Sequence, residues 1–150
     1  MGGLTARTYP VRRSHTNVMS ADPPKNYGLA AVGSTGRFDV EIDEVVEDAS
    51  QTQMSIHTPT WSFRFSLTER SIVARILSFL REQAGRLMFS EIVVGSFCDA
   101  PVRFIKDDEF GDRFFLRAHG EGQLVDFVLA ADELREFTDA VAQAVQDLES

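Results

Sequence analysis

The chain contains little of the residue types that build disulfides and metal sites. Its 150 residues include one cysteine, Cys98, and three histidines. A single cysteine cannot form an internal disulfide, and the histidines form no Cys-x-x-Cys or His-x-x-x-His pair of the kind that binds zinc. We therefore expect no bound metal and a reducing, cytoplasmic setting.

Long apolar runs and complete phosphate-binding motifs are also missing. No stretch approaches the roughly 18 apolar residues of a membrane-spanning helix, and the first residues lack the apolar core of a secretory signal. The GSTG sequence at 33–36 lacks the lysine that follows in a phosphate-binding loop, and GEG at 120–122 lacks a third glycine. The sequence thus predicts no membrane association and no nucleotide cofactor.

Charge is divided unevenly along the chain. Residues 1–37 hold five basic residues and one acidic residue (net +4), whereas the remainder holds ten basic and 22 acidic residues (net −12). Proline and glycine interrupt 1–36 without any sustained period, which indicates a flexible basic leader, with translation starting at Met1 or at Met19. Residues 37–150 then form a single domain. Thirteen arginines against two lysines favour a GC-rich bacterial source.

What is present is a clear alternation of strand and helix patterns. Apolar residues alternate with acids over 38–42, which we expect to be an edge strand. They alternate with polar residues over 54–67, where the proline at 58–60 predicts one bent strand or two short ones. Within this segment, alternation turns Trp61, Phe63 and Phe65 toward the core and Arg64 toward solvent. Strand patterns return at 92–94, 102–105, 114–118 and 124–129, with turns at 107–112 and 119–122. Two segments have helical spacing, with predicted buried stripes of Ile72, Val73, Ile76, Leu77 and Leu80, and of Leu134, Phe137, Val141, Val145 and Leu148.

These patterns predict an α+β fold, in which a mostly antiparallel sheet of about five strands packs on two amphipathic helices in the order β-β-α-β-β-β-α. A short residue pattern also occurs twice in the chain. Phe65 and Leu67 precede the first helix as Phe127 and Leu129 precede the second. Chance similarity explains two matched residues more simply than duplication, and both explanations stay open.

No set of residues indicates a reaction. Cys98 lies after an apolar strand, but neither His57 nor His119 lies in a motif that would make it the base of a nucleophilic cysteine. A lone cysteine beside a strand is usually a small buried apolar residue. The acidic turn at 107–112 lacks the ligand spacing of a calcium-binding loop. We therefore expect a protein that is not an enzyme and binds no cofactor.

Two groups of residues are candidates for binding a partner. Asp39, Glu41 and Asp43 alternate along the first strand, and the acidic body favours a basic partner protein. Phe115, Arg117 and His119 share one face of a later strand and form an aromatic and basic patch. The leading hypothesis is a regulatory or inhibitory, immunity-like protein-binding module that uses its acidic surface. The alternative is a sheet that binds single-stranded nucleic acid through the aromatic and arginine face.

Overall fold

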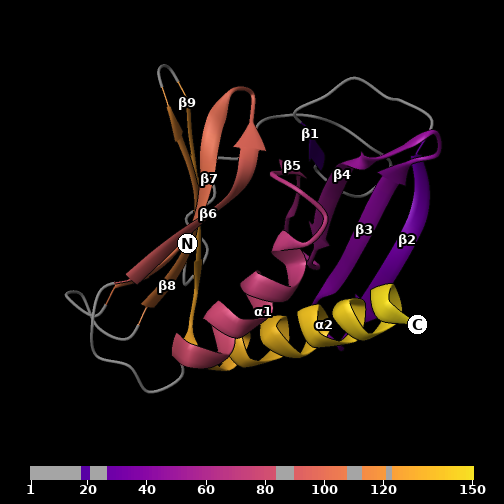
Figure 1. Cartoon of the computed structure of the whole chain (residues 1–150). Helices are drawn as coiled ribbons and strands as arrows, with labels where there is room; N and C mark the ends of the chain where they lie inside the picture. Colours follow the sequence, from indigo (N-terminus) through magenta and orange to yellow (C-terminus); the bar gives the residue numbers. More distant parts are fainter. Residues whose placement is uncertain (1–17, 21–26, 84–89, 108–112, 121–122) are drawn as a thin grey trace.

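The structure of the protein is a computed structural model that describes residues 18–20, 27–83, 90–107, 113–120 and 123–150. Nine strands and two helices lie within these residues (Figure 1). In chain order they are β1 (Val18–Ser20), β2 (Tyr27–Ser34), β3 (Asp39–Val45), β4 (Asp48–His57), β5 (Ser62–Leu67), α1 (Ile72–Gln83), β6 (Ser90–Phe97), β7 (Ala100–Asp107), β8 (Arg113–Gly120), β9 (Gln123–Leu129) and α2 (Ala131–Glu149). The predicted α+β class is confirmed.

All strands belong to one sheet. Strands β2 to β9 follow one another in sequence order and pair antiparallel, and β1 pairs in parallel with β5. The join between β5 and β6 is short, because only Ser66 with Ser96 and Leu67 with Gly95 are paired there. A Cβ atom on Gly95 would lie 1.8 Å from the Ser66 carbonyl oxygen, so only glycine permits this approach. The sheet therefore divides into two groups of four strands, which lie at an angle to each other in Figure 1.

Each group of four strands is followed by a helix, so the chain repeats a ββββα unit. The residues of the repeated pattern occupy equivalent places in the two units. Phe65 and Leu67 end β5, Phe127 and Leu129 end β9, and all four side chains are buried. This arrangement fits a duplication, which stays a hypothesis.

Both helices pack on the same face of the sheet and enclose one hydrophobic core. The two predicted helical stripes are confirmed, since their residues are buried or packed against the core. Aromatic rings join the two groups of strands: Trp61 stacks on Phe127 at 4.0 Å between centroids, and Phe63 lies 5.0 Å from Phe97. Such ring pairs contribute about 0.5–1.5 kcal/mol each beyond their buried area.

Helix α2 packs against the C-terminal part of β2, which is the terminal strand of the sheet. The main-chain N–H of Val32 donates to Asp147 Oδ2 at 2.9 Å, and that of Ser34 donates to Gln143 Oε1 at 2.9 Å. Side chains of the helix thereby satisfy backbone groups of an edge strand that would otherwise be available to another chain. Gly33 lies between these two residues and allows the close approach of the helix.

The number and order of strands differ from the prediction. Of the two alternatives for 54–67, the structure has two strands, which are antiparallel and joined by a turn at Thr58–Trp61. The predicted order gives three strands after the first helix, whereas four follow α1, one at each segment with a strand pattern. Residues 27–34, predicted as part of the leader, form β2, and 18–20 form β1. The glycines and alanines of β2 carry little strand signal, and at Gly33 the backbone of α2 lies too close for a side chain. With β2 in place, the strand predicted at the edge over 38–42 is an interior strand.

Two predicted turns lie partly outside the described residues. The hairpin around His119 is confirmed by the pairing of β8 with β9, whose last pair is Gly120 with Gln123, but 121–122 are not described. Of the acidic turn at 107–112, only Asp107 is described. Neither helix in the described part of the chain is long and apolar enough to cross a membrane.

Candidate functional site

The face of the sheet opposite to the helices, here called the outer face, is polar along β3, β4 and β5. Alternation turns Val40 and Ile42 of β3 into the core, and it turns the acids between them outward. The registers of β3 with β4 and of β4 with β5 then place nine polar side chains in three rows. We call these nine residues the polar grid: Asp39, His57 and Ser62; Glu41, Ser55 and Arg64; Asp43, Gln53 and Ser66.

Polar contacts connect side chains within the grid. His57 Nδ1 lies 3.0 Å from Ser62 Oγ, and His57 Nε2 lies 3.6 Å from Glu41 Oε1. Arg64 Nε donates to Ser55 Oγ at 2.8 Å. Ser55 and Ser62 are 0% and 1% exposed. Buried hydroxyl groups need a hydrogen-bond partner, and Arg64 and His57 provide one to each of these two. The grid is therefore an ordered network, with its carboxylates on β3 and its guanidinium on β5.

The three carboxylates on β3, which we call the β3 column, do not have equal surroundings. Asp39 is exposed, whereas Glu41 and Asp43 are half-buried. Burial raises the pKa of Asp43, and Glu41 raises it further, while Arg64 and His57 act in the opposite direction. Since removal from water disfavours the charged form, a cation placed beside Asp43 would recover part of the lost solvation.

A pocket of about 310 Å³ opens at the Asp39 end of the grid. It lies between the turn joining β2 to β3 and the turn joining β4 to β5, and we call it the turn pocket. Its lining consists of Gly36, Arg37, Asp39, His57, Thr58, Pro59 and Ser62.

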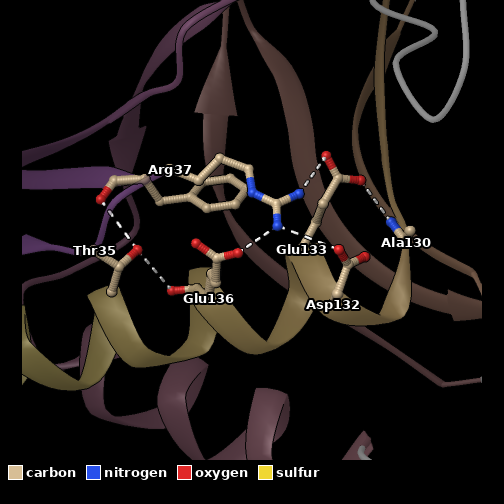
Figure 2. Close-up of polar contacts among 7 residues, drawn as sticks. Thr35, Arg37, Ala130, Asp132, Glu133 and Glu136 are labelled. Carbon is tan, nitrogen blue, oxygen red and sulfur yellow. Dashed lines mark hydrogen bonds and ion pairs between the residues drawn. The ribbon is translucent and has the colours of Figure 1, made fainter.

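Arg37 is held by the first turns of α2, as Figure 2 shows. Its guanidinium lies 3.2 Å from Asp132 and 3.7 Å from Glu133, and it also donates to Glu136. Hydrogen bonds to Asp132 and Glu136 raise the pKa of Arg37, and the bond from Arg37 lowers the pKa of Asp132. Glu133 also accepts the Ala130 N–H at 2.9 Å, which caps the helix start. Three carboxylates surround one guanidinium, so this end of the molecule retains negative charge.

The second predicted group also lies on the outer face. Phe115 and Arg117 are half-buried and His119 is exposed, opposite to the buried side chains of β8. Arg117 Nη2 donates to Asp126 Oδ2 at 2.9 Å, and its guanidinium carbon lies 5.2 Å from the centre of the Phe115 ring. Nη2 of Arg117 and one face of the Phe115 ring thus already have partners, whereas Nε of Arg117 is buried without a hydrogen bond to the described residues.

The structure does not bring the two predicted groups together. The acids lie on β3 and the aromatic patch lies on β8, and four strands separate them in the sheet. Sequence reasoning missed the other members of the grid, His57, Ser62 and Arg64 among them, as site residues. The alternation of β5 turned Arg64 outward correctly, but only the register between strands could place it beside Ser55.

Cys98 does not occupy the buried position that is usual for a lone cysteine. It is exposed, and together with Asp99 it forms the tight turn between β6 and β7 with positive φ angles of 50° and 67°. His57, one of the two histidines considered as its base, contacts Ser62 and Glu41 instead. Across the described ranges, no three His, Cys, Asp or Glu residues are grouped so that they could hold a metal ion.

Comparisons of the chain with protein-family models, with curated proteins and with solved structures found no match. The geometry and electrostatics of the grid and of the turn pocket therefore have to support any functional conclusion.

Proposed function

We propose that this protein is a non-enzymatic binding module that holds a basic partner protein against the polar grid, in a regulatory or inhibitory role. The observation that supports this proposal most directly is the β3 column, whose three carboxylates share one face of one strand. Alternate residues of a strand are about 6.6–6.8 Å apart, which is also the spacing of alternate side chains in an extended peptide. An extended partner segment with Lys or Arg at every second position therefore matches the column.

The surroundings of the column favour a cation. In the grid, three carboxylates are accompanied by one guanidinium, that of Arg64, whose Nε donates to Ser55. Arg37, next to the grid, is surrounded by the carboxylates of α2. A cationic segment would therefore approach along an attractive field, and salt should weaken the complex.

The experiment uses a fluorescein-labelled peptide with lysine at alternate positions, titrated with the full chain in anisotropy measurements at low and at physiological salt. The test variant carries Asp39→Asn, Glu41→Gln and Asp43→Asn. The control variant carries Glu82→Gln, Asp139→Asn and Glu149→Gln, which remove the same charge from exposed helix positions. Each ion pair between the peptide and the β3 column should contribute about 0.5–1 kcal/mol to binding. The test variant, which removes three of them, should therefore bind the peptide roughly tenfold more weakly or worse, and the control less than threefold more weakly. Equal losses in the two variants would refute a role for the grid.

Single-stranded nucleic-acid binding is the alternative, and the observation in its favour is that Phe115, Arg117 and His119 share the outer face. The bond from Arg117 to Asp126 gives it less support than the grid gives to a basic protein. A labelled oligonucleotide in the same assay at low salt decides between them. We further propose a cytoplasmic location, which the exposed thiol of Cys98 supports because a reducing compartment protects it.

A further inference from the structure

The turn pocket offers a carboxylate, that of Asp39, which no other described residue uses. Asp39 is exposed and makes no hydrogen bond or ion pair within the described part of the chain. The hydroxyl groups of the lining are already engaged: Ser62 Oγ with His57, and Thr58 Oγ1 with the main chain of Thr60 and Trp61. Among the described side chains of the lining, the Asp39 carboxylate is therefore the polar group that is open to an entering ligand.

The charge around the pocket selects the sign of that ligand. Asp39 lines the pocket, and Glu41 lies 3.6 Å from the His57 ring that also lines it. Arg37 carries the one guanidinium among the described lining residues, and three carboxylates of α2 contact it. A bound anion would be repelled by this surplus of carboxylates, whereas a cation would be attracted.

The size and the location of the pocket further restrict the kind of ligand that it can bind. Its volume of about 310 Å³ is at the lower end of the roughly 300–1,000 Å³ range of small-ligand pockets, which suits a single long side chain. Pro59 and Gly36 provide wall without charge, against which the methylene stem of Lys or Arg can pack. The pocket also lies where the β3 column begins, since Asp39 belongs to both.

We infer that the turn pocket receives the side chain of one arginine or lysine of the partner, which forms an ion pair with Asp39 and anchors an extended basic segment lying along the β3 column. This inference rests on the proposed function and names its partner: a segment with cations at alternate positions, the terminal one inserted between the two turns. Anchor side chains in such pockets commonly dominate the energy of an interface.

The test is a titration of the full ¹⁵N-labelled chain, followed by two-dimensional NMR, with three probes. One is the alternating lysine peptide, one is the same peptide with its pocket-end lysine replaced by glutamine, and one is Nα-acetyl-arginine amide. The matched variants are Asp39→Asn and Asp99→Asn, each of which removes one exposed carboxylate. Asn tolerates the positive φ of 67° at residue 99, so this control keeps its turn.

We expect the alternating peptide to shift the amide signals of Gly36, His57 and Thr58. Asp39→Asn, or glutamine at the pocket end of the peptide, should weaken binding about fivefold, and Asp99→Asn less than twofold. If the peptide binds and the triple grid variant weakens it while Asp39→Asn alone does not, the pocket inference is wrong and the proposed function stands. If the peptide does not bind the unmodified chain, the proposed function itself fails. Binding of acetyl-arginine amide as tight as that of the peptide would mean a small-molecule site and would overturn the partner assignment.

Discussion

Replacing Gly33 by alanine should be among the most damaging single changes in this protein. A Cβ atom at this position would lie 1.7 Å from the carbonyl oxygen of Ala140 and 2.7 Å from the amide nitrogen of Ala144. Both atoms belong to the backbone of α2, so no side chain can rotate away. The helix would have to move away from β2, and it would stretch the hydrogen bonds from Val32 to Asp147 and from Ser34 to Gln143.

The expected loss of stability follows from these two effects, the steric clash and the stretched hydrogen bonds. Overpacking of a core contact costs about 1–3 kcal/mol, and each weakened hydrogen bond costs about 0.5–1.5 kcal/mol. We therefore expect Gly33→Ala to lower the free energy of unfolding by about 3 kcal/mol, and the melting temperature by roughly 6–12 °C for a chain of this size. Urea denaturation followed by circular dichroism measures this loss.

Gly36 provides a matched control in the same hairpin, because a Cβ atom there would meet nothing within 4 Å. Gly36→Ala should leave stability unchanged or raise it by about 0.5–1 kcal/mol, since alanine restricts the unfolded chain. If the two alanine variants unfold at the same urea concentration, the close packing of α2 on β2 described above is incorrect.

The remaining predictions concern titration and turn chemistry. The hydrogen bond from Arg37 lowers the pKa of Asp132, so the charged carboxylate stabilises the fold above its ordinary pKa of 3.8. This contribution is lost as the pH falls through the lowered pKa. In urea titrations, Asp132→Asn should therefore make the free energy of unfolding depend less on pH below about pH 4. Burial is the main cause that raises the pKa of Asp43, so the charge of Asp43 opposes folding at neutral pH. Asp43→Asn should therefore stabilise the fold at about pH 7, and this gain should vanish near about pH 3. A loss of stability at neutral pH would contradict the prediction. Cys98 and Asp99 both have positive φ angles, so the pair Cys98→Asn and Asp99→Gly should raise the unfolding free energy by about 1 kcal/mol, and an unchanged melting temperature would argue against strain in this turn.

Periodicity predicted the parts of the fold that depend on local pattern. The apolar stripes of both helices and the inward turn of Trp61, Phe63 and Phe65 follow from spacings of three, four and two residues, and all are buried as predicted or packed against the core. Strand β2 escaped prediction because Gly28, Ala30, Ala31 and Gly33 interrupt its strand pattern, and at Gly33 the backbone of α2 leaves no room for a side chain. A strand with so many glycines and alanines carries little hydrophobic pattern.

The candidate site shows the same division. The sequence alone determined that Asp39, Glu41 and Asp43 share one face, because alternation in a strand is a property of the local backbone. The tertiary structure alone decided that His57 lies between Ser62 and Glu41, and that Asp39 opens into a pocket between two turns. Those neighbours come from separate strands, and their register is set by hydrogen bonds and packing between segments that no single stretch of residues specifies.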